Sequence, residues 1–257
     1  MRLDIYLFEN NYAKSRQGAK NLIVEGSICI DGVIVTKPAF DVKEGETHSI
    51  EVLNSCPYVS RGGLKLEKLL ELTGTDVKDK VCLDIGASTG GFTHCLLLNG
   101  AKRVYAVDSG SNQLAEELKR DLRVISLENF NARNLTIDAI GEPSDIVTID
   151  VSFISQTLII PSVCKVLSEN GKYLSLIKPQ FEAGRENIGK GGIVKSKKAR
   201  LDAVLRVISC ACENSLVCSF LAESPIKGGD GNIEYIGLFT KSGQALDIKS
   251  IKKIVLE

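Results

Sequence analysis

The chain has 257 residues, of which 44% are hydrophobic and 25% are charged, so it can bury the core of one large domain or two modest ones. Its 32 basic and 32 acidic residues balance, so the net charge gives no sign of a polyanionic partner. No apolar run reaches the roughly 20 residues that span a bilayer, and acidic residues near the start do not fit a secretory signal peptide. We therefore expect a cytoplasmic protein with no membrane partner.

Eight cysteines in a long chain without an export signal favour reduced thiols over a disulfide framework. Cys210, Cys212 and Cys218 form the one cluster that could be considered as a metal site. They lack a CxxC spacing and a nearby histidine, so we expect no metal.

The beginning of the chain predicts two helices followed by strands. Residues 2–10 are expected to form the first helix, and Ser15 is a suitable N-cap for a second helix that stops at Gly26. An Asp-Gly turn predicts a hairpin over 27–35, with a further strand near 48–53.

The motif Ser-Arg-x-x-Ala-Lys-x-Leu-Ile-x-x-Gly, followed by x-Ile-x-Ile-Asp-Gly, resembles the small RNA-binding domain named after a small-subunit ribosomal protein. This resemblance implies that basic side chains contact RNA phosphates and recognise backbone shape. The residues concerned are Arg2, Lys14, Arg16 and Lys20. The alternative interpretation is an ordinary solvated helix face, because this part of the chain is not basic in bulk.

From Lys80 onward, strand candidates alternate with helical stretches, which is typical of a parallel, doubly wound sheet with helices on both faces. The strand candidates are residues 81–85, 103–107, 123–127, 145–149 and 173–177. The final pair, 215–223 and 233–240, has no helix between its members, so we expect an antiparallel hairpin. We assign residues 1–55 to the RNA-binding domain, 56–63 to a linker and 64–257 to the second domain.

A glycine-rich turn follows the strand at 81–85. Its spacing, Gly86-x-x-x-Gly90-Gly91, lets the backbone approach a ligand but is not the dinucleotide fingerprint GxGxxG. Asp108 ends the next strand, where a carboxylate can accept hydrogen bonds from ribose hydroxyls. These features predict a nucleoside-bearing cofactor; the alternative is a turn made only for helix–sheet packing.

The motif Asp-x-Gly-x-x-x-Gly-Gly-Phe with a strand-end acid resembles the S-adenosylmethionine site of class I methyltransferases. The resemblance implies a Rossmann-like sheet, with Gly86 and Gly90 at the methionine end of the cofactor and Asp108 at its ribose. Either Asn129 or Asn131 would stand near the adenine. The full set of expected cofactor-binding residues is Asp84, Gly86, Ser88, Gly90, Gly91, Phe92, Asp108, Asn129, Asn131 and Asp150.

Two charged residues, Asp150 and Lys178, follow neighbouring strand candidates, so they should meet at the cofactor edge of the sheet. A ribose hydroxyl is a weak nucleophile and would benefit from such a lysine. With Lys65 and Glu234, they resemble the Lys-Asp-Lys-Glu tetrad of RNA ribose 2′-O-methyltransferases. The resemblance implies that Lys178 handles the proton of the acceptor hydroxyl and that Asp150 orients Lys178. Lys65 and Glu234 would position the hydroxyl.

Other methyl acceptors fit less well. The segment after the fourth strand reads Asp-Val-Ser-Phe, without the Asn/Asp-Pro-Pro-Tyr/Phe clamp expected for amino methylation. Neither the fourth nor the fifth strand ends in the cysteine that carbon-5 methylation of a pyrimidine needs.

Long motifs in order, including Ser-Arg-Gly-Gly-Leu-Lys, Asp-Ile-Gly-Ala-Ser-Thr-Gly-Gly-Phe-Thr and Ile-Lys-Pro-Gln-Phe-Glu-Ala-Gly, resemble the TlyA family over nearly the whole chain. The resemblance implies a cytidine 2′-O-methyltransferase that acts on ribosomal RNA or ribosomal subunits, not on DNA. It adds Arg61 and Arg133 to the RNA contacts. The segment Ser-Gly-Ser-Asn before Gln113 departs from the family pattern at the cofactor rim.

Two alternatives stay open. The family label haemolysin A suggests a membrane-active protein, which the absence of a long apolar segment disfavours. The other is an RNA-binding ribosome-assembly factor with a vestigial cofactor site, which the intact tetrad disfavours.

Overall fold

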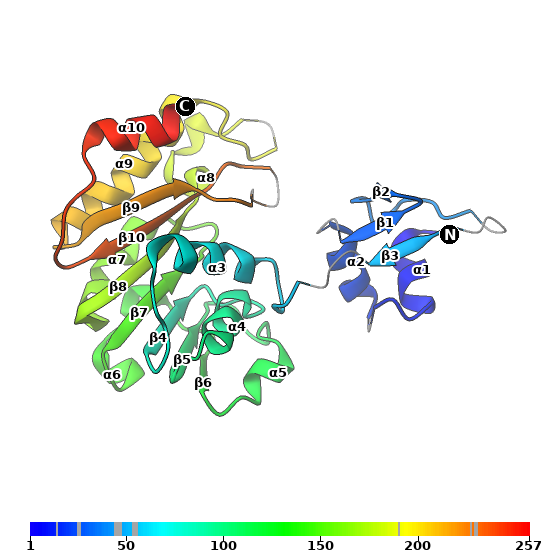
Figure 1. The fold of residues 1–257 in the computed structure, drawn as a ribbon, viewed down its shortest axis with the longest axis horizontal. Helices are drawn as coiled ribbons and strands as arrows, with labels where there is room; N and C mark the ends of the chain where they lie inside the picture. The colour runs from blue at the N-terminus through cyan, green and yellow to red at the C-terminus, as the bar shows by residue number, and fades with distance from the viewer. Residues whose placement is uncertain are drawn as a thin grey trace. The chain divides into compact units, whose positions relative to one another are not determined.

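In the computed structural model the chain divides into two compact units, Met1–Pro57 and Tyr58–Glu257 (Figure 1). The structure describes residues 1–13, 15–24, 27–43, 48–52, 56–189, 191–226, 228 and 231–257. Lys14, a predicted RNA contact, and Gly26, the predicted end of the second helix, lie outside the described residues.

The first unit packs two helices and a three-stranded antiparallel sheet around one small core. The elements are α1 (Leu3–Glu9), α2 (Arg16–Val24), β1 (Ile28–Ile30), β2 (Val33–Ile34) and β3 (Ile50–Val52), with strand order β2-β1-β3. The hydroxyl of Ser15 accepts a hydrogen bond from the backbone N–H of Gly18 at 3.0 Å, which caps α2 as the sequence predicts. Asp31 and Gly32 both have positive φ, +51° and +80°, as a tight hairpin turn requires.

The second unit is built on a seven-stranded sheet. Its strands are β4 (Val81–Ile85), β5 (Arg103–Val107), β6 (Val124–Leu127), β7 (Ser144–Ile149), β8 (Leu167–Ile177), β9 (Val217–Glu223) and β10 (Tyr235–Thr240). Their order is β6-β5-β4-β7-β8-β10-β9, and the first five strands in this order are parallel. This confirms the predicted doubly wound architecture.

The predicted antiparallel pair, β9 and β10, is present, but the two strands do not follow β8 in the sheet in the order in which they occur in the chain. The later strand, β10, lies between β8 and β9 and is antiparallel to both. In this interior position five of the six residues of β10 are buried, whereas β9, at the edge of the sheet, has only two buried residues.

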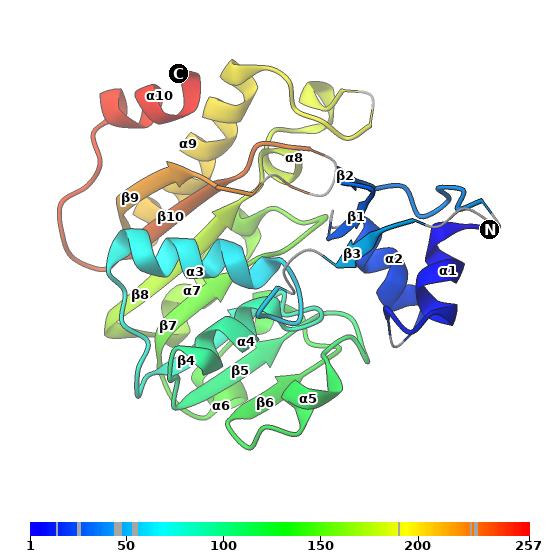
Figure 2. The same cartoon turned by 45° about the vertical axis from the view of Figure 1, so that its right-hand side comes forward.

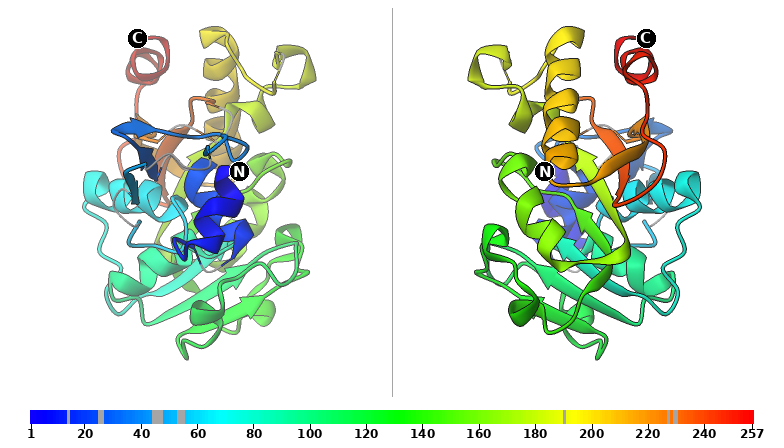
Figure 3. Two further views of the ribbon diagram at one scale, coloured as in Figure 1. Left: turned by 90° about the vertical axis from the view of Figure 1, so that its right-hand side faces the viewer. Right: turned by 90° about the vertical axis from the view of Figure 1, so that its left-hand side faces the viewer.

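Helices cover both faces of this sheet. They are α3 (Gly62–Thr73), α4 (Gly91–Leu98), α5 (Glu116–Lys119), α6 (Ile137–Ile140), α7 (Ile160–Val166), α8 (Pro179–Glu182), α9 (Lys197–Glu213) and α10 (Ile248–Leu256), with short 3₁₀ turns at Ala132–Asn134, Gln156–Leu158 and Arg185–Asn187. Figures 2 and 3 show α3 and α4 on one face and α7 and α9 on the other. The main core packs one face of the sheet against α7, α9 and α10.

The second unit begins at Tyr58, so most of the expected linker, 56–63, belongs to that unit. The ring of Tyr58 is buried, and its hydroxyl donates to Oε1 of Glu67 on α3 at 2.8 Å. The backbone N–H of Val59 donates to Nδ1 of His94 on α4 at 3.2 Å. Packing against two helices therefore fixes the segment that composition alone marks as a linker.

Among the helices that the structure describes, none is both long and apolar enough to cross a membrane. The cysteine cluster on α9 and β9 gathers no further ligands: no group of three or more His, Cys, Asp or Glu side chains in the described parts of the chain could hold a metal ion.

The close approach of Tyr58 to α3 gives a stability test. A Cβ atom at Gly63 would lie 2.2 Å from Cγ of Tyr58, whereas one at Gly62 would make ordinary contacts, the nearest at 3.4 Å. We expect Gly63→Ala to lower the free energy of unfolding by about 1–3 kcal/mol because the ring must move. Gly62→Ala, the matched control in the same helical turn, should leave it unchanged or raise it by up to about 1 kcal/mol. Urea unfolding of both variants checks this, and equal losses would contradict it.

Candidate functional site

The glycine-rich turn after β4 passes close to the end of β7. Gly86 has φ +83°, and a Cβ atom there would lie 2.5 Å from the carbonyl oxygen of Asp150. Any other residue would be strained in this conformation and would collide with the neighbouring backbone. Glycine at this position therefore lets the turn pass close to the backbone of Asp150.

The carboxylate of Asp108, at the end of β5, is fixed by the backbone around it. One oxygen, Oδ2, accepts from the N–H of Ser88 at 2.8 Å, and the other, Oδ1, accepts from the N–H of Gly110 at 2.7 Å. A carboxylate has about four acceptor positions, so Asp108 can still accept further hydrogen bonds from a ligand's hydroxyl groups.

A cavity of about 390 Å³ opens between these residues and the ends of β4, β5 and β7. The predicted cofactor residues Gly86, Ser88, Asp108, Asn131 and Asp150 line it. The rest of its wall is formed by Ile85, Val107, Ser109, Gln113, Phe130, Ala132, Val151, Ser152, Phe153, Ile154 and Ile159. An apolar cavity with a few fixed polar groups is typical of a cofactor site.

The sequence left open which asparagine stands near the base of the cofactor. Asn131 lines the cavity, and its side-chain oxygen caps a short turn by accepting from the backbone N–H of Arg133 at 3.1 Å. Asn129 has φ +53°, is exposed and does not line this cavity, although the structure describes it. The structure thus favours Asn131.

Four other expected cofactor residues, Asp84, Gly90, Gly91 and Phe92, do not line the cavity, although all are described. Gly90 has φ +96°, and a Cβ atom there would lie 2.2 Å from Leu118. One at Gly91 would lie 2.2 Å from the hydroxyl of Ser60, and Phe92 is buried. These three residues shape the turn and allow α4 to pack closely.

Asp84 is fully buried beneath the turn. Its carboxylate accepts from the hydroxyl of Thr93 at 2.7 Å and from that of Thr148 at 3.0 Å, so it ties α4 and β7 to β4. Burial is the largest effect on this group and raises its pKa from 3.8 to about 6, although both threonine hydrogen bonds oppose the rise.

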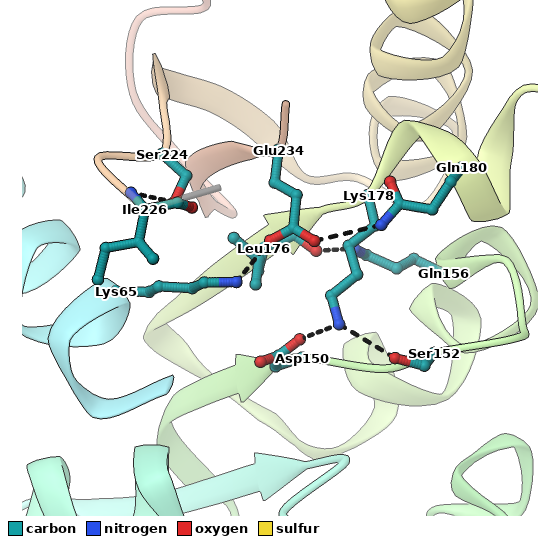
Figure 4. Close-up of polar contacts among 10 residues, drawn as sticks. All are labelled: Lys65, Asp150, Ser152, Gln156, Leu176, Lys178, Gln180, Ser224, Ile226 and Glu234. Atoms are coloured by element: carbon teal, nitrogen blue, oxygen red, sulfur yellow. Dashed lines mark hydrogen bonds and ion pairs between the residues drawn. The ribbon is translucent and has the colours of Figure 1, made fainter. Parts of the chain in front are cut away.

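The four predicted tetrad residues lie together as two ion pairs (Figure 4). Nζ of Lys178 lies 2.5 Å from Oδ1 of Asp150, and Nζ of Lys65 lies 2.6 Å from Oε2 of Glu234. All four side chains are largely buried, with 2–22% of their surface exposed.

Strand register brings these residues together. Ile177 pairs with Tyr235, so Lys178 and Glu234 come just beyond facing positions of β8 and β10. Asp150 follows β7, which is the neighbour of β8. Lys65 comes from the first turns of α3, which packs near β10.

Sequence reasoning missed two polar partners of this group. Nζ of Lys178 also donates to the hydroxyl of Ser152 at 3.1 Å, and Nε2 of Gln180 donates to the second oxygen of Glu234 at 3.2 Å. Both residues lie two positions beyond a predicted tetrad residue. That spacing is the one signal that could have indicated them.

The predicted RNA contacts lie on both units. In the first unit, the buried carboxylate of Asp4 accepts from Nε of Arg2 at 2.9 Å and from Nε of Arg16 at 3.2 Å, while both guanidinium groups stay about half exposed. The hydrogen bond from Arg2 lowers the pKa of Asp4. Lys20 is half-buried on α2.

The other two predicted RNA contacts belong to the second unit. Arg61 lies at the start of α3 and is half-buried, and Arg133 is exposed. Nε of Arg133 donates to the side-chain oxygen of Asn131 at 3.3 Å, so this arginine contacts a residue that lines the cavity.

Comparison with known families finds a match to the FtsJ-like methyltransferase model over residues 58–241 and to the S4 domain model over residues 1–48. Hemolysin A of Brachyspira hyodysenteriae is 45% identical to this chain, over 93% of the chain and 99% of the relative. The 16S/23S rRNA (cytidine-2′-O)-methyltransferase TlyA of Mycobacterium tuberculosis is 40% identical, over 99% and 95%. A solved hemolysin-like protein from Streptococcus thermophilus is 40% identical and has a TM-score of 0.79, covering 100% of this chain and 94% of that one.

The buried carboxyl of Asp84 predicts a specific pH dependence of stability. Its pKa is higher in the folded state than the ordinary value of 3.8, so the folded state holds this proton more tightly and the free energy of unfolding falls as pH rises from about 4 to about 6. Relative to Asp84→Asn, which does not titrate, the parent protein should lose about 3 kcal/mol across this window, since one pKa unit corresponds to about 1.4 kcal/mol.

Urea unfolding of both proteins at a series of pH values measures this difference directly. Titrating groups that do not interact with Asp84 contribute equally to both proteins and cancel. Parallel stability profiles for the two proteins would show that Asp84 does not titrate in this range.

Proposed function

Because this chain belongs to the TlyA/hemolysin A family of FtsJ-like methyltransferases, we propose that it methylates the 2′-hydroxyl of a cytidine in ribosomal RNA. The proposal rests on two lysine–carboxylate ion pairs, Lys178–Asp150 and Lys65–Glu234, which lie beside the cofactor cavity. The printed name and 40% identity of the mycobacterial relative support the choice of cytidine in ribosomal RNA. The partner would then be the ribosomal subunit or its RNA, in the cytoplasm.

The cavity suits S-adenosylmethionine, which supplies an electrophilic methyl group on its sulfonium sulfur. Gly86 lines the cavity and would face the cofactor with its backbone. The oriented carboxylate of Asp108 would accept hydrogen bonds from the ribose hydroxyls of the cofactor. Phe130, Asn131 and Ala132, which line the cavity wall next to Asp108, would border the adenine.

Lys178 is the residue that we assign to the acceptor's proton. A ribose hydroxyl must lose its proton as its oxygen bonds to the methyl carbon. Asp150 and Ser152 take two of the three donor positions of the Lys178 ammonium group, so one position can face the acceptor oxygen. In its charged form Lys178 stabilises negative charge on that oxygen, and in its neutral form it accepts the proton.

Lys65 and Glu234 would position the acceptor ribose. Glu234 is only 2% exposed, and its two oxygens are held separately by Lys65 and Gln180. This arrangement fixes a carboxylate and an ammonium group before the substrate arrives, so little reorganisation is needed on binding.

RNA binding is assigned to basic residues of both units. Arg2 contacts Asp4 through Nε and, at 3.4 Å, through Nη2, whereas Arg16 contacts it through Nε; the remaining terminal nitrogens would be presented to phosphates. Lys20 adds a further charge on α2, and Lys14 is included on sequence grounds alone. In the second unit, Arg61 and Arg133 would contact the RNA next to the site.

The proposal predicts the product and its dependence on Lys178. With labelled S-adenosylmethionine and ribosomal subunits from a strain that lacks the gene, label should appear in 2′-O-methylcytidine after digestion of the RNA to nucleosides. Lys178→Ala should lower the single-turnover rate by about 100-fold or more, because the proton-handling group is gone. Its affinity for S-adenosylmethionine, measured by calorimetry, should fall much less than the rate, because Lys178 does not itself line the described cavity, although its ion-pair partner Asp150 does.

Lys165→Ala is the matched control, because Lys165 is an exposed lysine on α7, before the start of β8. It should retain full activity. Label in a methylated base, or an unchanged rate for Lys178→Ala, would contradict the proposal. Cofactor binding without any label in RNA would favour a binding factor instead.

A further inference from the structure

The segment that follows β7 forms part of two cavities. Asp150, Ser152 and Phe153 line the cofactor cavity, and Phe153 also lines a second, adjacent cavity of about 590 Å³. The backbone N–H of Asp150 donates to the carbonyl oxygen of Ile85 on β4 at 3.0 Å, but from Val151 to Ser155 the segment belongs to no helix or strand. Its conformation must therefore be fixed by other contacts.

One residue of this segment has an unfavourable backbone conformation. Phe153 has φ +63°, in the left-handed region that bulky residues seldom adopt, and its side chain is 93% exposed. Its own burial therefore cannot hold it in place. A strained residue of this kind persists only when its surroundings determine it.

The far end of the segment is held by the carboxylate of Glu182, which lies at the end of α8. Oε2 of Glu182 accepts from the hydroxyl of Ser155 at 2.5 Å, and Oε1 accepts from the backbone N–H of Gln156 at 2.8 Å. Glu182 is 2% exposed, and burial raises its pKa. On the other side, Nη1 of Arg206 on α9 donates to the carbonyl oxygen of Glu182 at 2.7 Å and holds α8 in place.

The side chain of Gln156 continues this network into β8 (Figure 4). Its Nε2 donates to the carbonyl oxygen of Leu176 at 2.5 Å, and its Oε1 accepts from Tyr173 at 3.0 Å and from Ser175 at 2.6 Å. These β8 residues come just before Lys178. The network thus joins the segment that carries Asp150 to the strand that carries its ion-pair partner.

We infer that Glu182 is a positioning residue, whose carboxylate clamps the Asp150–Ile154 segment against β8 and so sets the geometry of the Lys178–Asp150 pair and the cofactor cavity. The kinetic part of this inference rests on the proposed methyltransferase function. The clamp itself does not, because it concerns the backbone that lines the cavity.

Two substitutions of similar length separate hydrogen bonding from side-chain size. Glu182→Met removes both acceptors, so the segment should relax. Glu182→Gln keeps an oxygen for the N–H of Gln156, and its amide can donate to Ser155, because a hydroxyl both donates and accepts. Val255→Ala, in the buried part of α10, is the control for a general loss of stability.

The full-length proteins are compared by hydrogen exchange, by calorimetry with S-adenosylmethionine, and by methylation of ribosomal subunits. Glu182→Met should speed exchange in residues 150–159 while leaving α10 unchanged. It should weaken cofactor binding and lower kcat, each by about tenfold to a hundredfold, since misplacement of about 1 Å can have effects of this size. The KM for subunits should change little, and Glu182→Gln should stay within a few-fold of the parent protein.

The inference is overturned if Glu182→Met behaves like Val255→Ala in exchange and cofactor binding, or if Glu182→Gln is as impaired as Glu182→Met. Failure of the parent protein to methylate any RNA would overturn the proposed function alone. In that case hydrogen exchange and cofactor affinity still decide whether the clamp exists.

Discussion

Lys178 and Asp150, which follow neighbouring parallel strands, meet at 2.5 Å at the edge of a cavity, and the rest of the site is arranged around this contact. Both side chains are largely shielded from water, so each charge needs the other to offset its desolvation. The contact depends on the register between β7 and β8, and any slip would separate the two residues. The second ion pair, between Lys65 and Glu234, depends in the same way on the register of β10 against β8.

Asp150 connects the cofactor cavity to the acceptor site. Its carboxylate contacts Lys178, and its carbonyl oxygen lies where a side chain at residue 86 would otherwise be. Asp150 therefore joins the glycine-rich turn to the tetrad. The hydrogen bonds of Glu182 and Gln156 hold the next residues of the same segment, and buried Asp84 supports the turn from below.

Local patterns in the sequence predict the strands, the glycine-rich turn and the strand-end positions of Asp108, Asp150 and Lys178. These features could be predicted because a strand and the residue that follows it are defined by a few consecutive side chains. The resemblance to known methyltransferases supplied Lys65 and Glu234, which are 169 residues apart in the chain.

Other features depend on contacts between distant residues and have no local signature. The sheet places β10 between β8 and β9, an order that no local pattern in either strand indicates. Gly90, Gly91 and Phe92 match a cofactor motif but do not line the described cavity, and Leu118 and Ser60 lie where side chains at the two glycines would be. The burial of Tyr58 against α3, and the partners of Glu182 and Gln156, likewise become visible only when the strands and helices are in place.

A double-mutant cycle on the single-turnover rate of methyl transfer tests most directly whether Lys178 and Asp150 act as one unit. The cycle uses Lys178→Met, Asp150→Asn and the combined variant, with the cofactor and ribosomal subunits at saturating concentrations. If the ion pair orients the proton-handling lysine, the combined variant should be no slower than the slower single variant, because the second change removes an interaction already lost. Losses that multiply in the combined variant would show that the two residues act independently and would contradict this account.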